Sequence, residues 1–460
     1  WGVDMKVLWL CNMVLPAAAR ELGMEASVKE GWVSGMAGAV LAGCHESGIR
    51  LSVAFPLPGH MIGPGQEFRA GTVDAETGGA GERASFSYYG FPEDVGHAEK
   101  YDGRLEHVLE KIVSIAEPDI VHCFGTEFPH TLAMCRAFPR KDRLLLGLQG
   151  LCTPIAEHYY ADLPERTVRR ATLRDRLKRD SLRRQREKFV LRGVMEREAV
   201  GLAGNITGRT RWDRMYAREW NPRARYFEMN ESLRPEFYGP VWDPEACEPH
   251  SIFLSQGDYP LKGLHYMLRA LRIILAVYPE AKLYVAGNSL VAYGTWKEKL
   301  KISGYGRFLR EMLTGLGLEG RVCFLGKLDA GQMRDRYLKC GLFVCCSAVE
   351  NSPNSLGEAM LLGVPCVSAD VGGISSIFTG GVDGILYRGS DHGGASGGPG
   401  TEGAGELGAV SGRLAEAVLE MWRDSRKRDE YCRNARNHAL KTHDRDRNYQ
   451  KLVEIYEEIL

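Results

Sequence analysis

Glu350 and Glu358 are two carboxylates, eight residues apart, on either side of an expected helix start. The apolar run at 341–345 predicts a strand before them, and Pro353 suits the first turn of a helix that ends at Gly363. A helix start presents free backbone N–H groups and the positive end of the helix dipole, and both favour a bound phosphate. A carboxylate can accept hydrogen bonds from sugar hydroxyls. The pattern therefore predicts a site for a diphosphate that carries a sugar.

The same stretch continues with Gly363-Val-Pro365 and with Asp370-Val-Gly-Gly373. This E-x7-E pattern, with these glycines and the proline behind it, resembles the retaining glycosyltransferases of family 4. The resemblance is densest over 251–386 and extends to 119–131 and 147–160. It implies the GT-B fold, in which two Rossmann-like α/β domains face a central cleft that holds a nucleotide-sugar.

The resemblance also implies roles for these residues. Glu350 would contact the hydroxyls of the donor sugar and face the reacting carbon. Glu358 would accept hydrogen bonds from the ribose, although a solvated helix carboxylate is the alternative. The helix start would offer N–H groups to the diphosphate or the sugar; these belong to Asn354, Ser355 and Leu356.

Lys262 matches a second family position, a lysine that grips the diphosphate together with an arginine five residues earlier. That earlier position holds Gly257, preceded by Gln256. A cation is needed to offset the charge that develops on the leaving nucleotide. Lys262 is therefore expected to carry this role with Gln256 beside it, helped by Arg209 or Arg211 from the first domain; an exposed turn lysine is the alternative.

Two further turns follow strand-like runs of the second half, and in the family such turns hold the nucleotide base through backbone groups. Ordinary turn chemistry explains them almost as well, so the base stays undetermined. The expected donor-binding residues in these turns are Gly287, Asn288, Gly326, Lys327 and Leu328.

The first half offers candidates for the acceptor and the phosphate. Asn12 follows the first strand, and Gly35 lies in a run of small residues that would permit close backbone approach. Gln149 stands where relatives often have histidine, and it cannot act as a base. Glu127 is therefore the candidate for orienting or deprotonating the acceptor, with Arg209 nearby as a cation.

Two other features are interpreted as structural. His122 lies within a strand-like run and is interpreted as a buried core histidine. The single D-x-D, at 444–446, follows no strand and is interpreted as a solvated face.

Front-side attack assisted by the donor phosphate needs no protein nucleophile, and a helix dipole with a lysine can replace a metal. No metal and no cofactor are expected; the nucleotide-sugar is a co-substrate.

Short apolar runs alternate with helical patterns in both halves, which predicts βαβ units and parallel sheets. We expect an acceptor domain over 1–235, with a proline-rich linker at 222–249, and a donor domain over 250–435. A C-terminal helix at 436–460 would pack on either domain, and the glycine-rich stretch 389–408 is expected to be a flexible insert.

Composition excludes some classes. Lys+Arg and Asp+Glu are both 59 in 460 residues, so a dedicated nucleic-acid binder is not expected. The 12 cysteines lack metal or disulfide spacing, and no signal peptide or membrane span is evident, which predicts a cytoplasmic protein. The stretch 165–188 reads as a helix with an arginine-rich face, either solvated or in peripheral contact with an anionic membrane.

These observations predict a metal-independent, retaining hexosyltransferase that uses a nucleotide-sugar and a glycan or lipid-linked glycan acceptor. By resemblance, its setting would be cell-surface polysaccharide biosynthesis. Two alternatives stay open: a nucleotide-sugar epimerase of the same fold, and a non-catalytic sugar-nucleotide binding protein.

Overall fold

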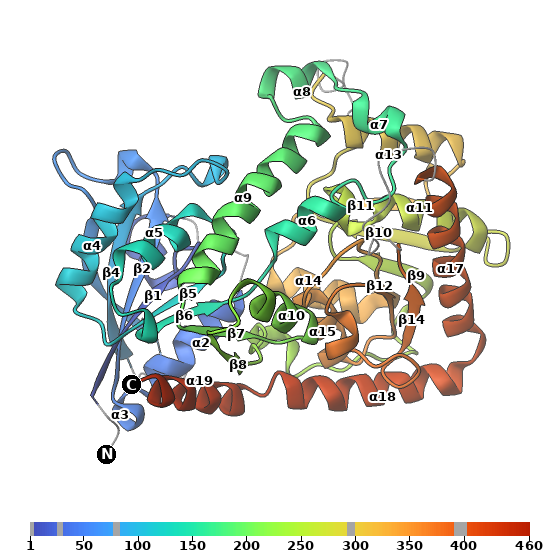
Figure 1. Cartoon of the computed structure of the whole chain (residues 1–460). Helices are drawn as coiled ribbons and strands as arrows, with labels where there is room; N and C mark the ends of the chain where they lie inside the picture. Colours follow the sequence, from blue (N-terminus) through green and yellow to red (C-terminus); the bar gives the residue numbers. More distant parts are fainter. Residues whose placement is uncertain (1–3, 25–30, 77–82, 292–299, 391–402) are drawn as a thin grey trace. The chain divides into compact units, whose positions relative to one another are not determined.

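A computed structural model describes residues 4–24, 31–76, 83–291, 300–390 and 403–460. The chain divides into two compact units, each built round one β-sheet (Figure 1). Unit 1 comprises Trp1–Thr153, Lys188–Arg234 and Thr442–Leu460. Unit 2 comprises Pro154–Glu187 and Pro235–Lys441. Both units are α/β, as the alternation of strands and helices predicts.

The sheet of unit 1 has the strand order β3-β4-β2-β1-β5-β6-β7-β8. Neighbours are parallel, except for the antiparallel pair β3 and β4 at one edge, which the sequence did not predict. The bounds are β1 Met5–Leu10, β2 Ile49–Leu57, β3 Arg69–Glu76, β4 Arg83–Pro92, β5 Ile120–Phe124, β6 Leu144–Gly147, β7 Asn205–Gly208 and β8 Arg225–Glu228.

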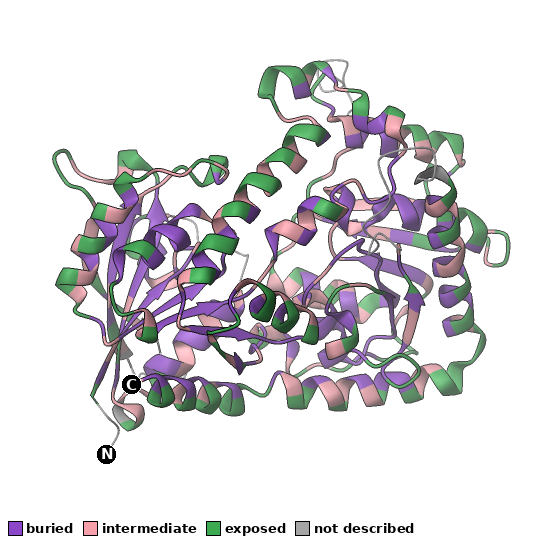
Figure 2. Ribbon diagram, in the orientation of Figure 1, coloured by how far each residue is buried: buried purple, intermediate pink, exposed green. Residues whose placement is uncertain are grey.

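Helices pack on both faces of this sheet, so its central strands are largely apolar. In β1, Val7 and Trp9 belong to one buried cluster, whereas Leu8 and Leu10 belong to another. Figure 2 shows these strands coloured as buried. The helices of unit 1 are α1 Pro16–Glu21, α2 Gly31–Ala42, α3 Cys44–Ser47, η1 Gly59–Met61, η2 Val95–His97, α4 Arg104–Ala116, α5 Pro129–Ala137, η3 Lys141–Arg143, α10 Arg211–Trp220 and α19 Arg445–Ile459. Two more, α6 Cys152–His158 and α9 Leu182–Leu202, contain residues of both units.

The C-terminal helix α19 is fixed to unit 1 by a buried polar chain. Trp9 Nε1–H donates to the hydroxyl of Tyr456 (2.8 Å), and that hydroxyl lies 2.8 Å from His122 Nδ1. Burial lowers the pKa of His122 to about 3, so its imidazole is neutral. His122 is therefore a core histidine, as interpreted from its place in a strand.

The sheet of unit 2 is parallel throughout, in the order β11-β10-β9-β12-β13-β14. The chain starts in the middle at β9, builds β10 and β11 on one side, and then β12 to β14 on the other. The strands are β9 Glu248–Leu254, β10 Lys282–Ala286, β11 Val322–Gly326, β12 Cys340–Cys345, β13 Cys366–Asp370 and β14 Ile385–Arg388. The helices are α7 Glu165–Arg169, α8 Leu173–Lys178, η4 Pro235–Phe237, η5 Pro260–Lys262, α11 Leu264–Ile274, α13 Gly304–Gly315, α14 Ala330–Lys339, α15 Asn354–Leu362, α16 Ile374–Ile377, α17 Gly403–Arg423 and α18 Ser425–Thr442.

The stretch 154–187 belongs to unit 2, although the sequence placed it within a domain at 1–235. Two neighbouring side chains of α11 hold it. His265 Nε2 lies 2.7 Å from the carbonyl oxygen of Ala161, and the Tyr266 hydroxyl donates to Asp162 (2.7 Å). These contacts join residues 104 positions apart, which no local pattern reveals.

Other expected boundaries also differ. The expected linker at 222–249 contains β8, which completes the sheet of unit 1, and the start of β9. In the expected insert at 389–408, residues 391–402 lie outside the described residues, and α17 begins at Gly403. The stretch 165–188 is not one helix but α7, α8 and the start of α9.

All 12 cysteines are free thiols, and most are buried, as expected from their spacing. Across the described ranges, no helix is both long enough and apolar enough to cross a bilayer.

Candidate active site

An ion pair joins the ends of two neighbouring strands in unit 2. Lys262 Nζ, after β9, contacts Glu350 Oε1, after β12, and the Ser347 hydroxyl donates to the same oxygen (2.8 Å). Both charged side chains are largely buried, with 21% and 13% of their surface exposed. The chain order of the sheet reverses between β9 and β12, and ligands of parallel sheets bind beyond the strand ends at such a point.

A glycine lets Lys262 reach this position. The helical turn η5 ends at Gly263, whose φ of +71° is left-handed. A Cβ at Gly263 would lie 1.8 Å from the carbonyl oxygen of Cys346. Only glycine therefore allows the chain after β9 to pass so close to the chain after β12.

A second glycine fixes the backbone of Glu350. Gly373 N–H donates to the carbonyl oxygen of Glu350 (2.9 Å). The preceding Gly372 has a φ of +55°, and a Cβ there would lie 2.0 Å from the same oxygen. The two glycines of the Asp-Val-Gly-Gly run thus position Glu350.

The charge state of the pair follows from its surroundings. Burial alone would lower the pKa of Lys262, but the Glu350 carboxylate outweighs this effect and raises the pKa above its usual range. The Tyr259 ring lies 5.8 Å from the ammonium, and burial raises the pKa of its phenol. Lys262 is therefore a permanent cation beside a neutral tyrosine.

The helix that follows Glu350 starts without a side-chain cap. Pro353 occupies the N-cap position, one residue before the first-turn position expected for it. Its carbonyl accepts from Leu356 N–H (3.0 Å), so this N–H is engaged, contrary to the expectation that it would face a ligand. By helix geometry, the N–H groups of Asn354 and Ser355 have no acceptor within the helix.

Glu358 lies one turn into α15 and is only 4% exposed. A solvated helix carboxylate is therefore excluded for it. The helix ends at Gly363 with a left-handed φ of +72°, as predicted. A carboxylate buried at this depth requires hydrogen-bonding partners.

The turns after β9, β10 and β11 lie at the same edge of the sheet. Asn288 Nδ2 donates to Asp258 Oδ2 (3.0 Å), and Gly287 N–H donates to the carbonyl oxygen of Gly326 (2.9 Å). Gln256 is half-buried beside Gly287, since a Cβ on that glycine would lie 3.6 Å from Gln256 Cγ. After β11, Lys327 is exposed and Leu328 is half-buried.

Packing explains why Gly257 is not an arginine. Gly257 is buried, and a Cβ there would lie 2.7 Å from Val285 Cγ1 and 2.9 Å from Leu264 Cδ2. Any larger residue would displace the side chains of β10 and α11. Lys262 is thus the cation of this site that both the sequence and the geometry identify.

Unit 1 carries a second polar group at the ends of β6, β7 and β8. Arg209 forms an ion pair with Glu231, and their side chains are 6% and 2% exposed. Gln149 bridges the two: its Nε2 donates to Glu231 Oε1 (2.8 Å), and its Oε1 accepts from Arg209 (3.3 Å). Sequence reasoning missed Glu231; its signal is a lone acid after β8. Arg209 is already neutralised within unit 1, which weakens its expected role as a spare phosphate-binding cation.

Glu127 follows β5 at the same edge of the unit 1 sheet. Its Oε1 accepts from Gly150 N–H (2.7 Å), whereas its Oε2 is buried and, within the described ranges, has no hydrogen-bond partner. Asn12 follows β1 and is half-buried. Gly35 lies beside the backbone of Leu233, because a Cβ on Gly35 would lie 3.8 Å from the carbonyl oxygen of Leu233.

Glu196 on α9 is a buried acid that sequence reasoning also missed. Its carboxyl accepts from the Thr126 hydroxyl (2.7 Å) and from Cys152 N–H at the start of α6 (2.8 Å). Burial raises its pKa from 4.5 to about 8, with a smaller contribution from Glu127. Helix α9 is rich in charged residues and shows no apolar face, so its sequence gives no local sign that Glu196 is buried.

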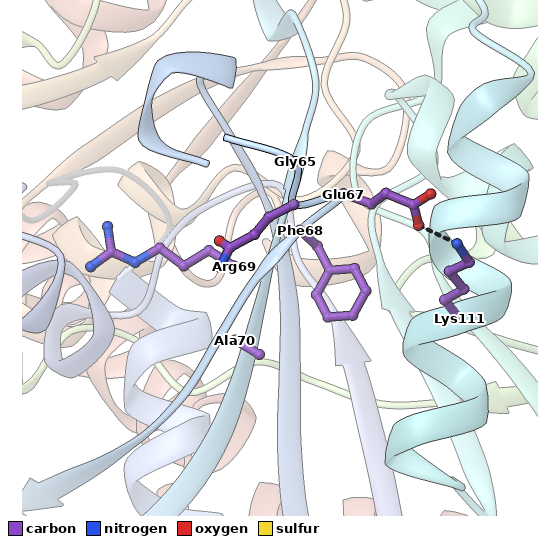
Figure 3. A pocket seen from close by; sticks show the side chains of 7 residues that line it. Gly65, Glu67, Phe68, Arg69, Ala70 and Lys111 are labelled. Atoms are coloured by element: carbon purple, nitrogen blue, oxygen red, sulfur yellow. Dashed lines mark hydrogen bonds and ion pairs between the residues drawn. The ribbon is translucent and has the colours of Figure 1, made fainter. Parts of the chain in front are cut away.

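A cavity of about 690 Å³ opens at the edge of unit 1 near the start of β3 (Figure 3). Residues 65–70 and Lys111 line it, and Lys111 pairs with Glu67 at 2.5 Å. This pairing lowers the pKa of Glu67. None of the candidate residues lines this cavity. In the part of the chain that the structure describes, no cluster of acids, histidines and cysteines could hold a metal ion.

Comparisons with known proteins agree with this geometry. A family model described as Glycosyl transferases group 1 matches residues 247–396, which include Lys262, Glu350 and Glu358. An uncharacterised glycosyltransferase, MJ1607 of Methanocaldococcus jannaschii, is 30% identical over 134 residues, 29% of this chain and 30% of that protein. Putative glycosyltransferase YtcC of Bacillus subtilis is 26% identical over 164 residues, 32% of this chain and 38% of that protein. The chain therefore spans about a third of the length of the curated relatives that it matches.

Solved structures resemble the whole chain. Sucrose-phosphate synthase from Thermosynechococcus elongatus covers 99% of it (98% of that chain) with a TM-score of 0.65 and 12% identity. Anabaena Alr3699/HepE, solved in complex with UDP, matches 99% of this chain and 100% of its own. The TM-score is 0.61 and the sequence identity is 16%. WaaG, a glycosyltransferase involved in lipopolysaccharide biosynthesis, matches 98% of this chain and 99% of its own. The TM-score is 0.58 and the sequence identity is 12%. At these identities the likeness shows the fold, and the predicted GT-B fold is confirmed.

Proposed function

We propose that this chain, whose residues 247–396 match the model of the group 1 glycosyltransferases, transfers a sugar from a nucleotide-sugar to an acceptor hydroxyl. The acceptor that we propose is a glycan or a lipid-linked glycan, in cell-surface polysaccharide assembly. The single observation that carries the donor half of this proposal is the Lys262–Glu350 pair beside the uncapped start of α15.

Lys262 and the start of α15 bind the donor diphosphate in this proposal. The ammonium and the N–H groups of Asn354 and Ser355 offset the charge of the leaving nucleotide without a metal. Glu350 keeps Lys262 charged and, through its second oxygen, accepts from a hydroxyl of the donor sugar. Glu358 accepts from the ribose.

The acceptor hydroxyl attacks the anomeric carbon from the side of the leaving group. The C–O bond to the diphosphate breaks, the new glycosidic bond forms on the same face, and the proton passes to a donor phosphate oxygen. The configuration of the sugar is therefore retained. Among the described residues Glu127 Oε2 has no hydrogen-bond partner, which supports the proposal that this carboxylate orients the acceptor.

A donor panel without acceptor tests this proposal, because an active transferase slowly hydrolyses its donor. UDP-sugars come first, since Anabaena Alr3699/HepE was solved with UDP-glucose. The first sugar released should have the anomeric configuration of the donor, as read by NMR. Glu350→Gln should abolish release, whereas Glu416→Gln, at an exposed position of unit 2, should not. Release of the inverted anomer, or equal release by Glu350→Gln, would contradict the proposal.

A second candidate function is non-catalytic binding of a sugar-nucleotide. Gly257 in place of arginine and Gln149 in place of histidine favour it. It predicts donor binding without any sugar release, and the same panel distinguishes the two. A nucleotide-sugar epimerase would instead give an epimerised sugar or donor.

A further inference from the structure

The arginine-rich stretch of unit 2 is broken into short helices by its own sequence. Arg170 is extended and ends α7, and Thr172 then caps α8 in a reciprocal pair of hydrogen bonds with Asp175. Arg179 adopts a left-handed φ of +51° and ends α8. The result is a six-residue helix, Leu173–Lys178, between two turns.

The orientation of α8 is opposite to that of an ordinary surface helix. Its acid faces inward: Asp175 is 3% exposed and accepts from the N–H groups of Thr172 (3.0 Å) and Gly304 (2.9 Å). Its two leucines face outward, with Leu173 56% and Leu177 77% exposed. Spaced four apart, they share one face of the helix. No other large apolar side chain in the described ranges is as exposed as Leu177.

The stretch that carries these leucines also holds cations that have no carboxylate partner among the described residues. The stretch 165–188 has nine arginines and two lysines against four acids. Each acid pairs with an arginine of the stretch: Glu165 with Arg169, Asp175 and Asp180 with Arg174, and Glu187 with Arg184. The exposed cations of the stretch that have no carboxylate partner in the described ranges are Arg166, Arg176, Lys178, Arg179 and Arg183.

We propose that α8 docks this protein on an anionic lipid bilayer, with Leu173 and Leu177 entering the interface and the surplus cations contacting lipid phosphates. An anionic bilayer can bind both kinds of side chain at one surface, because its negatively charged phosphates attract the cations and its apolar chains below accept the leucines. A nucleic-acid backbone supplies the charge but no apolar layer for two leucines. The locked Asp175 holds the leucines outward without any partner present. This inference does not depend on the donor site.

Vesicle co-sedimentation of the full chain tests the proposal. The probes are vesicles of phosphatidylglycerol with phosphatidylcholine, and vesicles of phosphatidylcholine alone. We expect binding to the anionic vesicles only, and weaker binding at about 0.5 M salt because exposed charges are then screened. The double variant Leu173→Ser/Leu177→Ser should weaken binding at least about tenfold, since it removes two buried apolar groups. The triple variant Arg176→Gln/Lys178→Gln/Arg183→Gln should weaken it similarly.

Matched controls use exposed positions elsewhere in unit 2. Val277 is 52% exposed, and Val277→Ser removes an exposed apolar side chain. The variant Arg423→Gln/Arg426→Gln removes exposed charges of α17 and α18. Both control variants should bind vesicles as the parent does. Circular dichroism should be unchanged in all variants, because none of these positions is buried. Failure of the parent to bind anionic vesicles, or equal loss in the controls, would overturn the proposal. Loss on charge removal alone, with the leucine variant unaffected, would also overturn it and would favour an acidic protein or nucleic-acid partner.

Discussion

Lys262 and Glu350 are 88 positions apart in the chain, yet they form an ion pair at the point where the strand order of unit 2 reverses. The pair depends on two glycines, because the backbone after β9 meets the backbone after β12 at Gly263, and the backbone after β13 meets Glu350 at Gly372. Geometry and charge at the candidate donor site therefore have one origin: close backbone approach at adjacent strand ends.

Removing the lysine should uncouple this pair. In Lys262→Met the Glu350 carboxylate stays largely buried without its cation, so we expect a loss of about 1–3 kcal/mol in unfolding free energy. Glu350→Gln in the same background should recover part of that loss, because no unpaired charge remains. Thermal unfolding of Lys262→Met, of Glu350→Gln and of the variant with both substitutions gives the coupling energy between the two side chains. Additive effects would show that the two side chains do not interact.

The two glycines should not tolerate a methyl group. Gly263→Ala and Gly372→Ala place a Cβ 1.8 Å and 2.0 Å from carbonyl oxygens, each at a left-handed φ. We expect each to lower the unfolding free energy by at least about 1–3 kcal/mol and to weaken donor binding. Gly315→Ala is the control, since nothing lies within 4 Å of the Cβ it adds. Equal stability of Gly263→Ala and the control would contradict this role.

The glycines and the glutamates were predictable because their signals are local. The apolar run at 341–345 lies in β12, and Gly363 ends α15, both as predicted. By contrast, β3 and β4 consist of mixed residues such as Arg69, Gly71 and Ser85, so the antiparallel edge left no clear alternation. Residues 154–187 belong to unit 2 because His265 and Tyr266 contact Ala161 and Asp162, each 104 positions earlier in the chain. Pairings of this kind depend on the folded chain and not on spacing.

Glu231 is the clearest case of a residue that only the fold identifies. Its carboxylate neutralises Arg209 at the end of β7, and both are nearly inaccessible to water. Glu231→Leu should therefore leave a buried, unpaired guanidinium and cost roughly 3–5 kcal/mol of unfolding free energy.

The double variant Arg209→Met/Glu231→Leu should be more stable than Glu231→Leu alone, because the buried charge is gone. Denaturant unfolding measures the difference. A double variant as unstable as Glu231→Leu would show that the pair is not the source of the loss.

Glu196 should make stability fall as the pH rises. Its pKa is raised by burial from 4.5 to about 8, so the folded state holds a proton that the unfolded state has lost between these values. The contribution is complete below about pH 4.5 and disappears as the pH passes about 8. Between about pH 5 and about pH 8, the melting temperature of the parent should fall more than that of Glu196→Gln, whose amide cannot ionise.

Glu219→Gln serves as the matched control for this test, since Glu219 is an exposed glutamate of unit 1. It should follow the pH dependence of the parent. If Glu196→Gln also followed the parent, the buried carboxyl would not be the titrating group.

We expect unit 2 to bind a nucleotide-sugar through Lys262 and Glu358. The most direct measurement is thermal unfolding of the full chain with UDP-, GDP-, ADP- and dTDP-sugars, for the parent, Lys262→Met, Glu358→Ala and Glu416→Gln. A donor at about 100 times its Kd adds about 2.7 kcal/mol of stability, which such an experiment resolves. We expect donors of one nucleotide to raise the melting temperature of the parent and of Glu416→Gln, and this rise to be lost in Lys262→Met and Glu358→Ala. No rise with any donor, or a rise that persists in both Lys262→Met and Glu358→Ala, would contradict this expectation.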